Sequence, residues 1–204
     1  MIPRRLFLSV LLAVLALAVA GCGESPTSPT STTVVAFGDS ITFGVGTTGS
    51  NDYVSRLAAR TGVPVENAGR PGDTTADALG RLEGSVLARD PDIVIVLLGG
   101  NDILQGMPVG QRIGNITTIV ERIRADGAAV ILVGLGSGPL DPFNGALPDL
   151  ASRTSSMLVP NVLEGIFGDT ALMADLIHPN DAGHAIIADR IEPALRAALA
   201  AVRA

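Results

Sequence analysis

The chain has 204 residues, of which 47% are hydrophobic and only 3% aromatic, and its formal net charge is −6. This length and composition suit one α/β domain with a large aliphatic core and leave little room for a second domain. The 14 basic residues are all arginines scattered along the chain, so no basic stripe is present for a nucleic-acid backbone. We therefore expect no nucleic-acid partner.

The N-terminal segment has the layout of a secretory signal. Arg4 and Arg5 precede the apolar run 6–20, and residues 17–22 read Leu-Ala-Val-Ala-Gly-Cys, which resembles a bacterial lipobox. We expect residues 1–21 to be a lipoprotein signal peptide and Cys22 to carry a lipid anchor to a membrane of the cell envelope, facing the periplasm or the exterior. An ordinary signal peptide or an uncleaved anchor would contain the same apolar run.

Residues 22–32 form a tract rich in Ser, Thr and Pro, which cannot bury apolar surface and suits an extended tether. Cys22 is the only cysteine, so a lipidated Cys22 leaves the domain without a thiol nucleophile, a disulfide or a thiolate metal ligand. We expect the folded domain to span residues 33–204.

Strands and helices alternate along this domain. The apolar run from Val34 predicts a strand that stops at Gly38-Asp39-Ser40, and residues 92–98 predict a second buried strand at or next to the centre of the sheet. Further strands are expected at 63–67, 128–135 and 157–163, and a loop at 134–148; helices are expected at 52–61, from about 74 to before Pro91, at 109–126, 147–155 and 181–202. This order predicts a three-layer α/β/α sandwich around a five-stranded parallel sheet.

Four polar turns should meet at one edge of that sheet. Ser40, Gly72 and Asn101 follow three predicted strands, and His178 precedes the last helix. Because the carboxyl ends of parallel strands share an edge, the fold alone would bring these turns together. A serine, a histidine and Asp175, three residues before the histidine, are the groups that acyl transfer requires as nucleophile, base and orienting carboxylate.

Plainer interpretations of the same residues exist. Ser40 could be a helix cap or a turn former, and Asp175 with His178 could cap the last helix. His184, the other histidine, lies within that helix, where a partly buried or solvated structural role is expected. Two histidines six residues apart give poor support for a metal site, and no G-x-S-x-G elbow surrounds any serine.

The four blocks together resemble the SGNH hydrolases, also called the GDSL lipase/esterase family, and most closely its branch of acyl thioesterases, lysophospholipases and arylesterases. The blocks are Gly38-Asp39-Ser40, Gly72 within 67–75, Gly99-Gly100-Asn101-Asp102, and Asp175 to Pro179. The resemblance implies a flavodoxin-like fold and a cofactor-free serine esterase with Ser40 as nucleophile, His178 as base and Asp175 as its orienting group.

The resemblance also implies an oxyanion hole formed by the backbone N–H groups of Ser40 and Gly72 and the side-chain amide of Asn101. Asp39 and Asp102 are assigned to bracing loops. The substrate would be a small-molecule or lipid ester or thioester, and the protein is expected to be a monomer. In relatives the stretch 134–148 contributes to the substrate pocket; here Phe143 is its only aromatic residue.

Other functions stay open on the sequence alone. A sugar acetylesterase of the same family would carry the same four blocks. A non-catalytic envelope lipoprotein could use the fold to bind carbohydrate or lipid. Loss of a catalytic residue would favour that function, but Ser40, Asn101, Asp175 and His178 are all present. A phosphate or nucleotide binder would need several converging N–H donors after the first strand.

Overall fold

The computed structural model describes residues 32–136 and 142–203. The predictions of a signal peptide at 1–21, a lipidated Cys22 and a tether that follows it lie outside these residues, apart from Thr32. The chain divides into Met1–Thr30 and Ser31–Ala204, and all of the described residues belong to the second unit.

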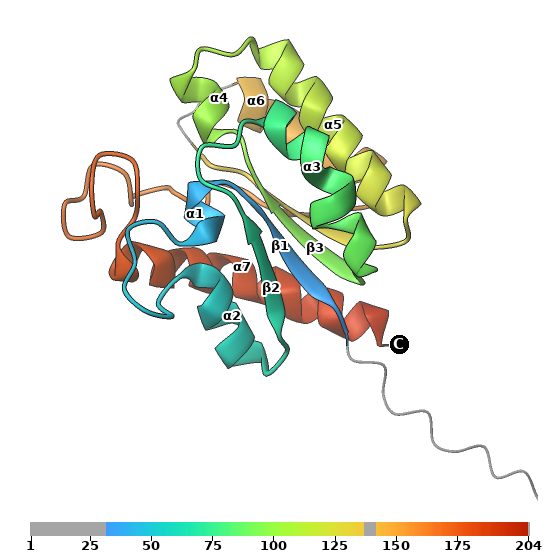
Figure 1. Cartoon of the computed structure of the whole chain (residues 1–204), viewed down its shortest axis with the longest axis horizontal. Coiled ribbons are helices and arrows are strands. Elements are labelled where there is room, and N and C mark those ends of the chain that lie inside the picture. The colour runs from blue at the N-terminus through green and yellow to red at the C-terminus, as the bar shows by residue number, and fades with distance from the viewer. Residues whose placement is uncertain (1–31, 137–141, 204) are drawn as a thin grey trace, which may run out of the picture. The chain divides into compact units, whose positions relative to one another are not determined.

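A five-stranded parallel sheet forms the centre of this unit (Figure 1). The strands are β1 (Val34–Gly38), β2 (Val65–Gly69), β3 (Ile93–Leu97), β4 (Ala129–Val133) and β5 (Met157–Val159), in the order β2-β1-β3-β4-β5. The predicted α/β fold is confirmed, and β3 is the central strand. The chain moves outward from β1 to β2 and then returns to the other side of β1, so the strand order reverses between β1 and β3, where open α/β sheets bind their ligands.

The strand ends coincide at this point. Gly38, the last residue of β1, pairs with both Gly69 and Leu97, the last residues of β2 and β3. The turns that carry Ser40, Gly72 and Asn101 therefore leave the sheet from one edge. This alignment is the structural basis of the site described below.

Helices cover both faces of the sheet (Figure 1). On one face α2 (Tyr53–Thr61) and α7 (Asp181–Val202) pack against the side chains of Val34, Ala36 and Ile95. On the other face α3 (Thr75–Ser85), α5 (Val109–Ala125) and α6 (Pro142–Arg153) pack against Val35 and Phe37. Successive residues of β1 thus enter opposite layers, and all residues of β1 and β3 are buried, as expected for strands covered on both sides.

Several boundaries differ from the predictions. β2 begins at Val65, after Pro64, and continues through the polar residues to Gly69, because the ladder with β1 extends that far. Helix α6 begins at Pro142, inside the predicted 134–148 loop, and contains Pro148; its apolar residues Phe143, Leu147 and Leu150 are buried against the sheet. β5 stops at Val159, before Pro160, which has no N–H for a ladder.

Two short helices occupy predicted turns. α1 (Ser40–Phe43) and α4 (Gly100–Leu104) follow β1 and β3 directly, and a 3-10 turn (Leu87–Arg89) follows α3. The last helix has the predicted bounds 181–202.

The two ends of the described domain meet. Arg203 Nε lies 3.5 Å from Thr32 Oγ1, at the edge of the sheet where β1 begins, opposite the edge that carries Ser40. Among the described residues no helix is both long and apolar enough to span a membrane.

Candidate active site

Ser40 is the first residue of α1, immediately after the turn at the end of β1. The N–H groups of a first helical turn have no acceptor inside the helix. The carboxylate of Asp39 caps the helix by accepting the N–H of Ile41 at 3.0 Å, so the cap does not occupy the N–H of Ser40. The hydroxyl and the backbone N–H of Ser40 therefore both lie at the start of α1, where a ligand could contact them.

Helix α1 is fixed from behind by polar contacts. Thr42 Oγ1 lies 2.9 Å from the hydroxyl of Tyr53, and the Asn67 side chain donates to the Thr42 carbonyl at 2.7 Å. A Cβ at Gly69 would lie 2.2 Å from the backbone nitrogen of Phe43, so only glycine permits β2 to approach α1 this closely. These contacts hold the turn that carries Ser40 against two neighbouring elements.

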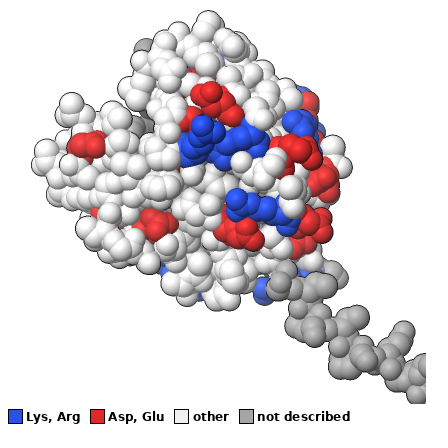
Figure 2. All heavy atoms as spheres, in the orientation of Figure 1, with Lys and Arg blue, Asp and Glu red and all other residues white. Residues whose placement is uncertain are grey.

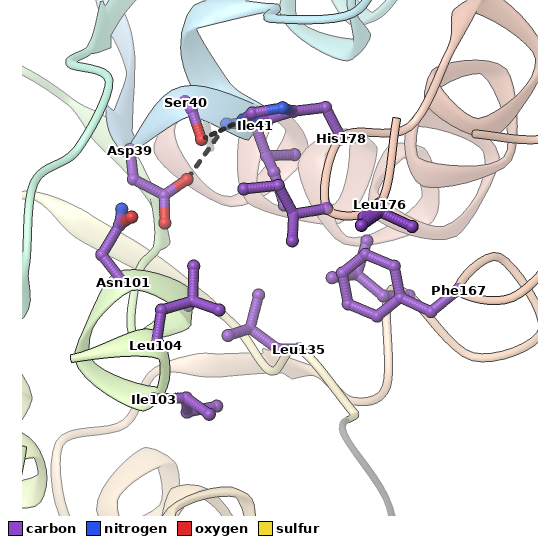
Figure 3. A pocket seen from close by; sticks show the side chains of 13 residues that line it. Asp39, Ser40, Ile41, Asn101, Ile103, Leu104, Leu135, Phe167, Leu176 and His178 are labelled. Atoms are coloured by element: carbon purple, nitrogen blue, oxygen red, sulfur yellow. Dashed lines mark hydrogen bonds between the residues drawn. The ribbon is translucent and has the colours of Figure 1, made fainter. Parts of the chain in front are cut away.

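His178 faces Ser40 from the segment before α7. Its Nε2 lies 3.2 Å from Ser40 Oγ (Figure 3). Its Nδ1 lies 2.7 Å from Asp175 Oδ2. A carboxylate only accepts, so in a neutral ring Nδ1 carries the proton and Nε2 is the acceptor for the serine hydroxyl. The structure thus brings together the three residues that the sequence selected, in a continuous hydrogen-bonded chain.

Asp175 is oriented by its own loop. Its Oδ1 accepts the backbone N–H groups of Ile177 and His178, both at 2.8 Å. The hydrogen bond to the His178 ring, followed by these two N–H groups, lowers the pKa of Asp175 to about 2. The side chain is half exposed, yet it is an anion with a fixed direction toward the histidine over the whole neutral and mildly acidic range.

The second predicted block forms a turn beside the nucleophile. Gly72 has φ +86°, a left-handed conformation that favours glycine. A Cβ there would meet no protein atom within 4 Å, so the backbone conformation, and not a close contact, accounts for glycine at this position. Asp73, next in the chain, is buried and paired with Arg81, which also donates to the Gly38 carbonyl at 3.0 Å.

The third block, Gly99 to Asp102, is hydrogen-bonded to the second block. Asn101 donates from Nδ2 to the Asp73 carbonyl at 2.9 Å, which places its amide one residue from Gly72. Asp102 is fully buried and accepts the N–H and the hydroxyl of Thr75. The bracing role expected for Asp102 agrees with these bonds, which join α4 to the start of α3.

Asp39 is buried at the wall of the site, only 2% exposed. Burial raises its pKa to about 6, against the lowering effect of the Ile41 N–H and of nearby His178; Asp102 and Asp73 raise it further. It is thus a carboxyl that is held close to Ser40 and changes charge near neutral pH, in addition to its capping role.

His184 belongs to the structural layer behind α1. It is fully buried, and its Nδ1 accepts the N–H of Tyr53 at 3.2 Å while the two rings stack at 6.2 Å between centroids. Burial lowers its pKa to about 4, so the ring is neutral at physiological pH. The expectation of a structural histidine agrees with this environment, and the side chain is more deeply buried than expected.

An apolar cavity of about 170 Å³ opens beside Ser40 and His178 (Figure 3). Ser40, Asn101 and His178 lie in its wall together with Asp39. The remaining lining is mostly apolar: Ile41, Ile103, Leu104, Leu135, Leu163, Phe167, Leu176 and Ile177. Gly72 lies on the adjacent turn and is outside this lining.

Most of the apolar lining was missed by the sequence analysis. Phe143, the aromatic residue singled out in 134–148, is buried in the core and does not line the cavity, whereas Leu135 of the same stretch does. Phe167, Leu176 and the α4 pair Ile103-Leu104 line it instead. One sequence feature could have indicated part of this lining: Ile103 and Leu104 directly follow Asn101-Asp102, and two consecutive apolar residues are unusual in a surface turn. Among the described residues no cluster of three or more His, Cys, Asp or Glu could hold a metal ion.

The chain is similar to known ester hydrolases. It is 33% identical to esterase TesA of Pseudomonas aeruginosa over 176 residues, covering 80% of this chain and 88% of that protein. It is 29% identical to thioesterase 1/protease 1/lysophospholipase L1 of Escherichia coli K12 over 166 residues, covering 77% of this chain and 80% of the relative. The crystal structure of TesA superposes with a TM-score of 0.75 at 34% identity, covering 81% of this chain and 99% of the solved chain, so almost the whole solved chain corresponds to part of this one.

The GDSL-like Lipase/Acylhydrolase family matches residues 36–186, a range that contains all four sequence blocks. With the fold, the relatives and the match in agreement, the chain belongs to the GDSL-like lipase/acylhydrolase family, the SGNH hydrolases, and is an ester hydrolase.

Proposed function

We propose that this protein hydrolyses carboxylic esters or thioesters through an acyl-enzyme formed on Ser40. The observation that carries the proposal is the chain of contacts from Ser40 Oγ to His178 Nε2 and from His178 Nδ1 to Asp175 at the wall of an apolar cavity. His178 takes the serine proton as Oγ attacks the carbonyl carbon, and returns it to the departing alcohol or thiol. Water, activated by the same ring, then releases the acid.

The oxyanion is assigned to three donors: the N–H groups of Ser40 and Gly72 and the Nδ2 of Asn101. An amide nitrogen carries two protons, and the bond to the Asp73 carbonyl uses one of them. That bond fixes the plane of the amide while the other N–H stays available. Preorganised donors of this kind are each worth a factor of about 10²–10³ in rate.

The size of the cavity suggests the acyl group. A cavity of about 150 Å³ holds a benzene-sized molecule, and the volume here is about 170 Å³. An aryl group or an acyl chain of roughly six carbons would fill it, while a longer chain would extend over the apolar residues at its opening. The same lining offers few polar partners for a sugar, which makes a sugar acetylesterase or a carbohydrate-binding protein a weaker proposal.

The decisive experiment uses residues 33–204 and p-nitrophenyl esters of two to sixteen carbons. Ser40→Ala should reduce kcat by at least about a thousandfold without changing the far-ultraviolet circular dichroism spectrum. The ratio kcat/KM should peak at medium acyl lengths. Hydrolysis that survives in a folded Ser40→Ala protein would remove the nucleophile assignment.

We further propose that the protein is a monomer attached to the cell envelope through a lipid on Cys22. The support is the lipobox-like sequence at 17–22 and a site whose parts all come from one chain.

A further inference from the structure

The exposed apolar side chains of the domain are concentrated at one place. Seven large apolar side chains are conspicuously exposed among the described residues, and five of them line the opening of the cavity beside Ser40. These five, which we call the rim, are Ile103, Leu104, Phe167, Leu176 and Ile177. Leu176 is 96% exposed and Leu104 61%, far more than lining a pocket requires. A cluster of this kind on a domain surface marks a site of contact.

The rim has two sides that flank the opening. Ile103 and Leu104 come from α4, while the other three come from the segment between β5 and α7. In Figure 3 Phe167 and Leu176 lie on the other side of the cavity from Asn101. Whatever covers both sides of the rim also covers the path to the Ser40 hydroxyl.

The charges around the rim indicate which kind of surface can bind there. Neither 99–108 nor 160–178 contains an arginine or lysine, and the second segment carries the exposed carboxylates of Glu164, Asp169 and Asp175. In Figure 2 the projection on the left, where this segment lies, shows red atoms and no blue ones. Anionic lipid surfaces attract basic segments, so they would repel this one.

We propose that the rim docks the domain onto the surface of uncharged, zwitterionic phospholipid, with the cavity opening against the lipid. Apolar side chains without neighbouring arginines or lysines suit insertion between neutral headgroups. Protein-binding surfaces are typically anchored by Trp, Tyr and Arg, none of which is in the rim. The proposal rests on the proposed function in one respect, since docking in this direction presents a lipid-borne ester to Ser40.

The test uses tryptophan as a reporter, because the chain contains none. Leu176→Trp in residues 33–204 places the only tryptophan on the rim, and Val202→Trp places it near the C-terminal end of α7, at a side chain that is also exposed. Both carry Ser40→Ala to prevent turnover. Each is titrated with vesicles of phosphatidylcholine, of phosphatidylglycerol, and of phosphatidylcholine brominated in its acyl chains.

With phosphatidylcholine we expect a blue shift of the Leu176→Trp emission and quenching by the brominated lipid, with no change for Val202→Trp. Binding to phosphatidylglycerol should be at least about tenfold weaker at low salt. In the Leu176→Trp protein, adding Leu104→Ser should lower the partition coefficient at least about tenfold, and adding Val202→Ser should not.

Three outcomes would overturn the proposal: unchanged Leu176→Trp emission in phosphatidylcholine, equal responses of the two reporters, or a blue shift that follows protein concentration without lipid. The last would assign the rim to a second copy of the chain. Hydrolysis of soluble p-nitrophenyl esters is measured separately on the protein with Ser40 intact. Failure of docking and failure of the esterase assignment are therefore distinguished.

Discussion

Two buried groups near Ser40 should give the stability of the domain opposite responses to pH. The folded state holds the pKa of Asp39 at about 6, above its ordinary value of 3.8, because burial penalises the anion. It holds the pKa of His184 at about 4, below its ordinary value of 6.5, because burial penalises the cation. A group whose pKa differs between the folded and the unfolded chain contributes to the free energy of unfolding by an amount that depends on pH.

The two contributions nearly cancel. Between pH 4 and 6 native Asp39 keeps a proton that the unfolded chain releases, so its contribution falls as pH rises. Between pH 4 and 6.5 the unfolded chain holds a proton on His184 that the native state excludes, so that contribution rises with pH. At about 1.36 kcal/mol for each pKa unit, each is about 3 kcal/mol in full, of which roughly 2 to 3 kcal/mol falls between pH 4 and 7.

Replacing Asp39 by Asn should remove one of the two opposing contributions, so that the pH dependence of stability follows His184. The asparagine oxygen can still accept the Ile41 N–H, so the cap on α1 is kept. From pH 7 to pH 4 the free energy of unfolding should fall by about 2 kcal/mol more in Asp39→Asn than in the wild type. Urea unfolding followed by circular dichroism at several pH values measures this difference.

The reverse control is His184→Gln, whose stability should fall as pH rises through the same range. The amide oxygen of glutamine is able to take the N–H of Tyr53 in place of Nδ1. Parallel curves for Asp39→Asn and the wild type from pH 7 to pH 4 would refute the reasoning, because they would mean that Asp39 ionises alike in the folded and unfolded chains.

Other changes test the site and its supports. Asp175→Asn should lower kcat about 10⁴-fold with little effect on KM, as measured with p-nitrophenyl butyrate, because the histidine would lose the anion that fixes its tautomer; a loss below about tenfold would argue against that role. Tyr53→Phe should destabilise the domain by about 1–3 kcal/mol in urea unfolding, since the buried Thr42 hydroxyl loses its partner; an unchanged midpoint would contradict this. Gly72→Ala should cost about 1–2 kcal/mol in urea unfolding because alanine is strained in the left-handed backbone conformation; equal stability of the two proteins would argue against that strain. Cys22→Ala in the full chain should move the protein from the membrane to the soluble fraction, and retention in the membrane would favour an uncleaved anchor.

The sequence predicted the sheet and the convergence of the polar turns because both depend on local patterns. β1 and β3 are apolar at nearly every position, which identifies strands covered on both faces. Once the sheet is parallel, the turns after its strands must share an edge. Ser40 and His178, which are 138 positions apart in the sequence, could therefore be placed together from these local patterns alone.

The sequence failed where packing outweighs local preference. Pro148 and the glycines around it indicated a loop, yet burial of Phe143, Leu147 and Leu150 against the sheet stabilises a helix through the proline. The cavity lining depends on side chains from α4 and from the segment after β5, which is separated from α4 in the sequence by α5, β4, α6 and β5. No periodicity distinguishes such residues from ordinary exposed or core positions, so apart from the pair Ile103-Leu104 the rim is recognised only in the three-dimensional structure.

The meeting of Thr32 and Arg203 makes the domain a candidate for circular permutation. A short linker could join these ends, and new ends could be opened at exposed Gly127, between α5 and β4. The join and the cut both lie at the edge where the strands begin, so neither interrupts the loops that hold Ser40, Asn101 or His178. A permuted chain would keep its hydrolytic site, and its new terminus at Gly127 would lie at the edge of the sheet opposite Ser40. Coupled to a carrier through that terminus, the domain would have its cavity opening directed away from the carrier.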